Sequence, residues 1–165
     1  MASEVSFDVV SEFDRQELVN ALDQVRREIA SRYDFKHATV ELELGKEEIT
    51  LLTDDEYRAR AVKDLLESKA IRRGLSLKIF EWGVIAPAGG NRVRQEIGLR
   101  RGLPEDLAKK ISKMIRDDFP KCHAQIQGDA VRVSSKIKDE LQKVIARLRA
   151  EGDAYPVPLQ YQNYR

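Results

Sequence analysis

The chain has 165 residues, of which 42% are hydrophobic and 35% charged, enough apolar material to bury the core of one domain or two small ones. Its five prolines and nine glycines are too few for a disordered chain. No run approaches the roughly 20 apolar residues of a membrane span, and the first ten residues do not resemble a signal peptide. A single cysteine, Cys122, excludes an internal disulfide. We therefore expect a cytosolic protein without a membrane partner.

The formal net charge of +1 conceals an uneven distribution along the chain. Residues 1–90 hold 13 Lys and Arg against 18 Asp and Glu, whereas residues 91–165 hold 16 against 10. The first part therefore carries a net charge of −5 and the second +6. On this count, an anionic ligand is expected on the C-terminal half.

The hydrophobic pattern predicts the same order of elements twice: strand, helix, strand, strand, helix, strand. Helix starts are indicated by capping residues followed by apolar residues at spacings of three and four. The expected elements are a strand at 6–11, a helix from Asp14, strands at 39–44 and 48–52, a helix from Thr53 to about Lys69, strands at 75–82 and 93–100, a helix from Pro104, a hairpin at 121–136, a helix capped by Ser134 or Ser135, and a strand at 156–164.

The stretch 84–92, VIAPAGGNR, combines a proline with paired glycines and is the expected boundary between two domains, residues 1–88 and 89–165. Each half then has the elements of a ferredoxin-like sandwich, with two helices on one face of a four-stranded antiparallel sheet. RNA-recognition domains share this plan. The predicted fold is therefore α+β, a tandem of two ferredoxin-like βαββαβ domains.

The hairpin KCHAQIQGDAVRVSSK at residues 121–136 is the clearest candidate for ligand binding. Alternation gives it an apolar face and a polar face, and Gly128-Asp129 is typical of a tight turn. An arginine can hold a phosphate with two bonds, and glutamines two residues apart can read base edges from the same side. The predicted anion site therefore comprises Lys121, Gln125, Gln127 and Arg132 on the exposed face of the hairpin, where Arg132 is expected to contribute little to packing. An ordinary solvated sheet face is the alternative interpretation.

Lys110 and Lys113, on the helix before the hairpin, are an alternative pair of anion ligands. In this fold, helices and the open sheet face lie on opposite sides, so both groups cannot contact one small ligand. Lysines at helical spacing are typical of a solvated surface, which favours the sheet face.

Signatures of an enzyme are missing from the sequence. Neither a GxxxxGK[ST] phosphate loop nor a strand-to-helix GxGxxG motif occurs. His37 and His123 are the only histidines, and no second pair at metal-ligand spacing accompanies Cys122-His123. Neighbouring strand residues point to opposite faces, so those two side chains cannot form a catalytic pair either. We expect no catalytic residues, no metal and no cofactor.

The strand at 75–82 offers a second candidate surface. If Leu77 and Ile79 face the core, Lys78, Phe80 and Trp82 lie on the open face of the first sheet, where aromatic rings stack bases in RNA-recognition domains. Packing of the two rings between the two domains is the alternative interpretation. The hairpin strand AVRVSS contains no aromatic residue, so base stacking is not expected there.

Four segments resemble the YajQ family of small bacterial nucleotide-binding proteins, a resemblance that covers essentially the whole chain: SFDVVSE, AKKI, AQIQGDAVRV and LQYQNYR. It implies two tandem domains that exchange their first strands, so that residues 6–11 complete the C-terminal sheet and 93–100 the N-terminal one. The exchange would create an alternative nucleotide-binding set of Phe80, Trp82, Arg94 and Arg100. After the hairpin, SSKIKDELQ departs from the more glycine- and arginine-containing family pattern, so no ligand contact is carried over there.

Three functions follow as alternatives. The first is a cytosolic nucleotide-binding protein without catalytic activity, such as a sensor of cyclic di-GMP or a purine nucleotide (GTP or ATP). The second is an RNA-binding protein that uses the basic C-terminal half. The third is an adaptor whose sheets dock a protein partner.

Overall fold

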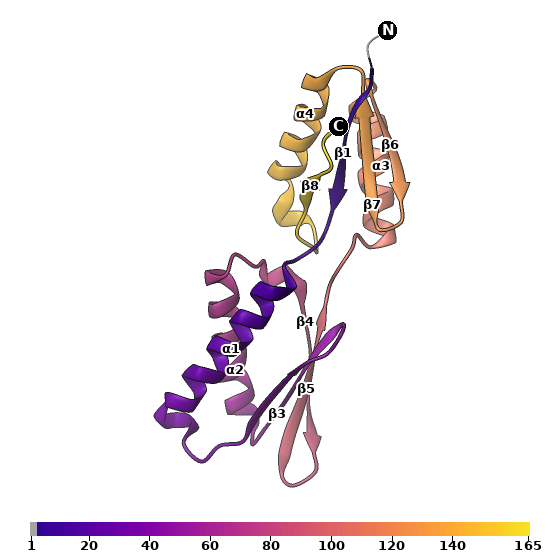
Figure 1. Ribbon diagram of the computed structural model, residues 1–165. Coiled ribbons are helices and arrows are strands. Elements are labelled where there is room, and N and C mark those ends of the chain that lie inside the picture. Colours follow the sequence, from indigo (N-terminus) through magenta and orange to yellow (C-terminus); the bar gives the residue numbers. More distant parts are fainter. Residues whose placement is uncertain (1–2) are drawn as a thin grey trace. The chain divides into compact units, whose positions relative to one another are not determined.

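The computed structural model describes residues 3–165. In this range the chain forms two compact units, one made of residues 13–100 and the other of the chain up to residue 12 together with 101–165. Within the described range, each unit has one four-stranded antiparallel sheet and two α-helices (Figure 1). The predicted α+β class is confirmed. None of the helices formed by residues 3–165 is long and apolar enough to cross a membrane.

The unit of residues 13–100 has the strand order β2-β3-β5-β4. Short 3-10 turns at Tyr33–Phe35 and Leu77–Ile79 precede β2 and β4. In chain order, its elements are α1 (Arg15–Ser31), β2 (Val40–Leu44), β3 (Glu48–Thr53), α2 (Glu56–Arg72), β4 (Phe80–Ala88) and β5 (Arg92–Leu99).

The other unit, which we call the β1 unit, has the strand order β6-β7-β1-β8. A 3-10 turn at Gly152–Ala154 follows its last helix. In chain order, its elements are β1 (Val5–Val10), α3 (Glu105–Asp118), β6 (Cys122–Gln127), β7 (Ala130–Ser135), α4 (Lys138–Ala150) and β8 (Gln160–Gln162).

The first strand of each half of the chain pairs with strands of the other half. β1 lies between β7 and β8, and β5 lies between β3 and β4. In the strand orders β6-β7-β1-β8 and β2-β3-β5-β4, β1 and β5 occupy the same, third position. The two sheets therefore have the same arrangement of strands. Residues 84–92, where the sequence suggests a domain boundary, run from β4 through the hairpin turn to the start of β5, inside the unit of residues 13–100.

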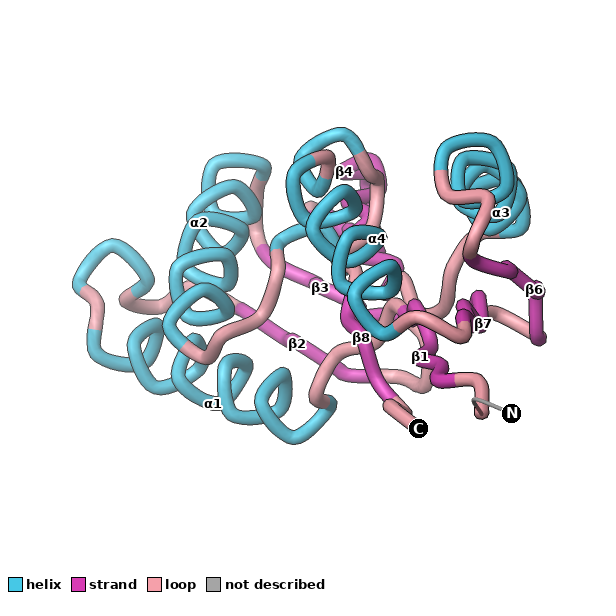
Figure 2. Tube along the Cα trace, turned by 90° about the horizontal axis from the view of Figure 1, so that it is seen from above, coloured by secondary structure: helices cyan, strands magenta, loops and turns pink. Residues whose placement is uncertain are grey.

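Each unit buries its own apolar core between its helices and one face of its sheet. Leu22 of α1, Leu66 of α2 and Ile97 of β5 belong to one core, and Phe7 of β1 and Leu148 of α4 belong to the other. Figure 2 shows α3 and α4 on the same side of the β1 unit's sheet. The opposite face of that sheet is therefore left open.

Two predicted helix caps have different outcomes. The carboxylate of Asp14 accepts hydrogen bonds from the backbone N–H groups of Gln16 and Glu17, so this cap is confirmed. The prediction that Thr53 caps α2 is wrong. Thr53 ends β3, where its buried hydroxyl donates to the carbonyl of Thr39, and Asp55 caps the helix instead.

Candidate functional site

The open face of the β1 unit's sheet is polar across all four strands. The face of the sheet toward the helices is marked by four fully buried residues, Phe7, Val9, Val131 and Val133. The residues that alternate with them along β1 and β7 therefore point away from the helices. The strand register aligns these residues in two rows, Gln125, Arg132, Asp8 and Gln162 in one, and His123, Ser134 and Ser6 in the other.

A hollow of about 400 Å³ lies on this face, a volume within the range of small-ligand sites. Its lining residues are Glu4, Ser6, His123, Gln125, Gln127, Arg132, Ser134 and Arg165. Three of the four predicted ligand residues therefore line one hollow. The fourth, Lys121, does not line it, because it lies in the turn before β6, where its carbonyl accepts a hydrogen bond from Ser135 Oγ.

Arg132 is held in an ion pair across the sheet. Its Nε and Nη2 donate to Oδ1 and Oδ2 of Asp8, at 2.9 and 3.3 Å, and Asn163 Nδ2 donates to Oδ2 at 2.9 Å. Mainly through the hydrogen bond from Arg132, the pKa of the Asp8 carboxyl is lowered, and the same bond raises the pKa of Arg132. The sequence predicts Arg132 as an exposed strand residue; in the structure its side chain is only partly exposed and is paired with Asp8, which is 7% exposed.

Arg165 supplies a second guanidinium to the hollow. Its backbone N–H and C=O pair with those of Ser6, at 3.0 and 3.1 Å, and the ring of Tyr164 stacks on Phe7 with centroids 6.1 Å apart. Asn163 makes the turn into this segment with a φ of 57°. Among residues 3–165 we find no hydrogen bond or ion pair to the guanidinium of Arg165. Apart from its place in the segment LQYQNYR, no feature of the sequence points to Arg165.

The alternative ligand set on the other sheet does not converge on one surface. The prediction that Phe80 and Trp82 lie on its open face is wrong. Phe80 is 3% exposed in the core, and Trp82 packs half-buried against that core, with Lys63 Nζ of α2 4.9 Å from its ring centroid. The 3-10 turn at Leu77–Ile79 causes the difference, because the strand alternation begins only at Phe80.

The two arginines of this alternative set, Arg94 and Arg100, have different surroundings from the two rings. Arg94 is exposed and alternates with the buried Gln95, so it points to the open face. Arg100 Nη1 donates to the carbonyls of Lys78 and Phe80, at 3.1 and 3.4 Å. Nucleotide binding by these four residues stays a prediction, without a common surface to support it.

The difference in net charge between residues 1–90 and 91–165 is absent when the charges are counted for the two folded units. Residues 13–100 hold 16 Lys and Arg and 16 Asp and Glu, and the β1 unit holds 13 and 12. The exchange of strands explains the change, because β5 carries Arg92 and Arg94 into one unit while β1 carries Asp8 into the other. The bulk charge therefore no longer favours one unit for an anion, and only local groups distinguish the two.

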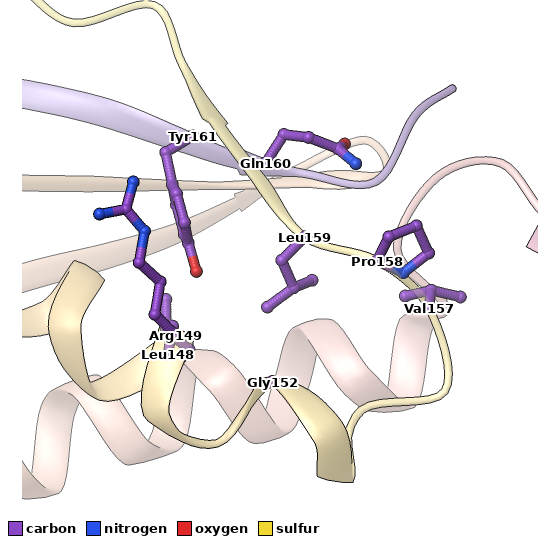
Figure 3. Close-up of a pocket in the computed structure, with 8 residues that line it drawn as sticks. All are labelled: Leu148, Arg149, Gly152, Val157, Pro158, Leu159, Gln160 and Tyr161. Atoms are coloured by element: carbon purple, nitrogen blue, oxygen red, sulfur yellow. The ribbon is translucent and has the colours of Figure 1, made fainter. Parts of the chain in front are cut away.

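A second hollow, of about 470 Å³, lies in the β1 unit between the end of α4 and β8 (Figure 3). Leu159, which precedes β8, and Tyr161 of β8 point toward α4, whereas Gln160 points the other way, where its Oε1 accepts from the backbone N–H of Glu12. The guanidinium of Arg149 lies over the Tyr161 ring, 5.3 Å from its centroid. The remaining lining residues are Leu148, Gly152, Val157 and Pro158.

Metal-binding groups do not gather in the part of the chain that the structure describes. Within residues 3–165, no three His, Cys, Asp or Glu side chains are placed to hold an ion. Cys122 is buried, and burial raises the pKa of its thiol, which disfavours the thiolate that binds metals.

Residues 5–165 match the family model described as nucleotide-binding protein YajQ-like. The chain belongs to this family. A nucleotide-binding protein of Trichormus variabilis is 58% identical over 165 residues, one of Roseiflexus castenholzii 53%, and one of Chloroflexus aggregans 58%; in each case both chains are covered completely. The resemblance read from the sequence is confirmed over its full length.

Proposed function

We propose that the chain binds a nucleotide in the hollow on the open face of the β1 unit's sheet, and that it has no catalytic activity of its own. The observation that carries the proposal is the presence in one hollow of the amides of Gln125 and Gln127 and of the Arg165 guanidinium, which makes no hydrogen bond or ion pair among residues 3–165 and interacts with Asp8 only electrostatically. The relatives are named nucleotide-binding proteins, and those names contain no enzyme activity. What we propose beyond those names is the face of the sheet that binds the nucleotide and the residues that contact it.

The hollow offers separate groups for the two ends of a nucleotide. Gln125 and Gln127 lie on the same side of β6, and each amide can both donate to and accept from a base edge. The hydroxyl groups of Ser6 and Ser134 add two small donors or acceptors at the adjacent strands. Arg165 can hold a phosphate with two parallel hydrogen bonds.

Arg132 has a positioning role in this proposal. Its Nε and one terminal nitrogen already bond to Asp8, so its charge is largely balanced before a ligand arrives. Asp8 in turn bonds to Asn163, which starts the segment that carries Arg165. The Arg132–Asp8–Asn163 network therefore supports the position of Arg165 rather than supplying the phosphate contact itself.

The proposal also includes the architecture of the domains that form the site. We infer two ferredoxin-like domains with exchanged first strands, in which β1 is the central strand of the ligand-binding sheet. On that face the two central strands present Ser6, Asp8, Arg132 and Ser134, none of which is aromatic. Recognition would therefore rest on hydrogen bonds and charge, in contrast to the stacked bases of RNA-recognition domains.

The experiment is a calorimetric titration of nucleic-acid-free protein with cyclic di-GMP, GTP and ATP. We expect at least one to bind, and Arg165→Gln to weaken that nucleotide roughly ten- to hundredfold, the cost of one charge-assisted phosphate contact. Arg116→Gln is the matched control, since Arg116 is an exposed arginine on α3 outside the hollow. Equal affinity of parent and Arg165→Gln protein would place the phosphate elsewhere.

The same titration tests the other two functions when a structured RNA is added at several salt concentrations. Affinity for RNA that falls steeply with salt, without binding of mononucleotides, would favour an RNA-binding protein. Absence of binding to every ligand would favour the adaptor. Steady turnover of a bound nucleotide, abolished by a substitution in the hollow, would contradict the absence of catalysis.

A further inference from the structure

We infer that the hollow between α4 and β8 is a second ligand site, which takes a small planar anion: an aromatic or heteroaromatic ring that carries one phosphate or carboxylate. It lies on the helix side of the β1 unit's sheet, so it is separate from the proposed nucleotide site and does not depend on it. Three features of the lining carry the inference: its apolar walls, the ring of Tyr161 and the charge of Arg149.

The walls of the hollow are apolar and firmly held. Leu148 is fully buried and Val157 is 1% exposed, and both belong to the core of the β1 unit. Leu159 and Tyr161 pack against the same core, and Pro158 completes the wall (Figure 3). Side chains fixed in this way leave a preformed surface on which a flat ring loses little entropy when it binds.

Tyr161 provides an aromatic face at the hollow. Its ring is fixed from behind by an edge-on contact with Phe7, at 6.0 Å between centroids. Burial raises the pKa of the Tyr161 phenol, so its hydroxyl keeps its proton at neutral pH and can donate a hydrogen bond. Among residues 3–165, no hydrogen-bond partner is found for this hydroxyl.

Arg149 provides a positive charge that forms no ion pair with an acidic group among residues 3–165. The neighbouring Arg147 bonds to Asp118 and to Glu151, at 3.0 and 2.6 Å, and Glu151 also accepts from the hydroxyl of Tyr155. These contacts engage Asp118 and Glu151, and Asp153, the exposed acidic residue of the 3-10 turn after α4, makes no hydrogen bond or ion pair to Arg149 among the described residues. Within the described chain, Arg149 has only its contact with the Tyr161 ring.

The combination of these groups defines the ligand. An isolated phosphate would contact Arg149 but leave the apolar walls in water, whereas an uncharged ring would leave the guanidinium without an acceptor. A ring with one anionic substituent satisfies both when the ring lies between Tyr161 and Leu159 and its anion reaches past the edge of the Tyr161 ring to Arg149, whose guanidinium lies over the other face of that ring (Figure 3). Gln160 points to the opposite face, so a ligand of this size cannot also reach Gln125 (Figure 3).

The test is an NMR titration of the full chain with phenyl phosphate and, in a second arm, benzoate. We expect shift changes at the methyl groups of Val157, Leu148 and Leu159, and none at the side-chain amides of Gln125 and Gln127. Cyclohexyl phosphate, which keeps the charge but is not planar, should bind several-fold more weakly, and inorganic phosphate should not shift the methyl groups.

Three variants separate the roles of the lining residues. Arg149→Gln should weaken phenyl phosphate roughly three- to tenfold, the scale of one exposed charge-assisted contact, while Arg116→Gln should not. Tyr161→Phe keeps the ring and should change affinity less than Tyr161→Leu. If Tyr161→Leu does not fold, the affinities of Arg149→Gln and Tyr161→Phe for phenyl phosphate still test the site.

Two outcomes would overturn the inference. The first is the absence of methyl shifts at millimolar phenyl phosphate, which would mean that Arg149 and Tyr161 form only a packing contact. The second is equal binding of phenyl phosphate, cyclohexyl phosphate and inorganic phosphate, which would reduce the site to non-specific attraction by a surface charge.

Discussion

Asp8 and Arg132 face each other across β1 and β7 and form a two-bonded ion pair between residues 124 positions apart in the chain. Asn163 donates a third hydrogen bond to the same carboxylate. The pair joins the first strand of the chain to the C-terminal hairpin, and it lies in the middle of the polar sheet face. We therefore expect the pair both to stabilise the place of β1 in this sheet and to position the groups of the proposed nucleotide site.

Removal of one member of this pair should destabilise the β1 unit. Arg132→Ala leaves the Asp8 carboxylate, 7% exposed, with Asn163 as its remaining side-chain donor. We expect a lower urea midpoint in Arg132→Ala than in Gln125→Ala, a neighbouring exposed position of β6 without such a partner role. The double variant Asp8→Asn with Arg132→Gln should recover part of the loss, and a midpoint unchanged by Arg132→Ala would show that the pair contributes nothing to stability.

The same pair predicts a pH dependence of stability. Hydrogen bonds from Arg132 hold the pKa of Asp8 below its usual value of 3.8. A carboxyl whose pKa is lowered by folding contributes stability above its unfolded pKa, and loses it as pH falls through the folded value. Urea unfolding of the parent should therefore show an extra loss of stability below about pH 4 that Asp8→Asn does not show. Identical pH profiles for the two proteins would contradict this assignment.

The sequence was sufficient for features that depend on near neighbours. The alternation in residues 121–136 predicted β6 and β7 as a hairpin, and the cap at Asp14 is the one observed. The pairing of Asp8 with Arg132 could not be predicted from the sequence, because no local pattern specifies which distant strand lies beside β1. The place of Phe80 was missed for a different reason, since one short 3-10 turn reverses the alternation that follows it.

The strand exchange makes residues 13–100 a contiguous and complete unit. This segment contains all four strands of its sheet, whereas a fragment of residues 1–88 lacks β5, the strand between β3 and β4. Loss of a central strand leaves unpaired backbone groups on both neighbours. We expect residues 13–100 alone to unfold cooperatively in urea, and residues 1–88 to lack a folded core by NMR. Cooperative folding of residues 1–88 would show that β5 is dispensable.

Ile97 tests how strongly β5 belongs to that unit. Its side chain is fully buried in the core of residues 13–100, although a division of the chain at residue 88 would assign it to the other half. Ile97→Ala should lower the free energy of unfolding by about 2–5 kcal/mol, the usual range for a buried isoleucine. Val84→Ala is the control, since this β4 residue is 83% exposed and should change stability by less than about 0.5 kcal/mol. Similar small effects from both substitutions would contradict the packing of β5.

Trp82, the only tryptophan, reports which sheet binds the nucleotide. Its ring packs half-buried against the core of residues 13–100, beside Lys63 of α2. A nucleotide on the open face of the β1 unit's sheet should therefore leave its fluorescence, excited at a wavelength the nucleotide does not absorb, unchanged through a saturating titration. Trp82→Phe should bind with the parent's affinity. Quenching that follows the calorimetric binding curve, together with weaker binding by Trp82→Phe and Arg94→Gln but not by Arg165→Gln, would move the site to the sheet of residues 13–100.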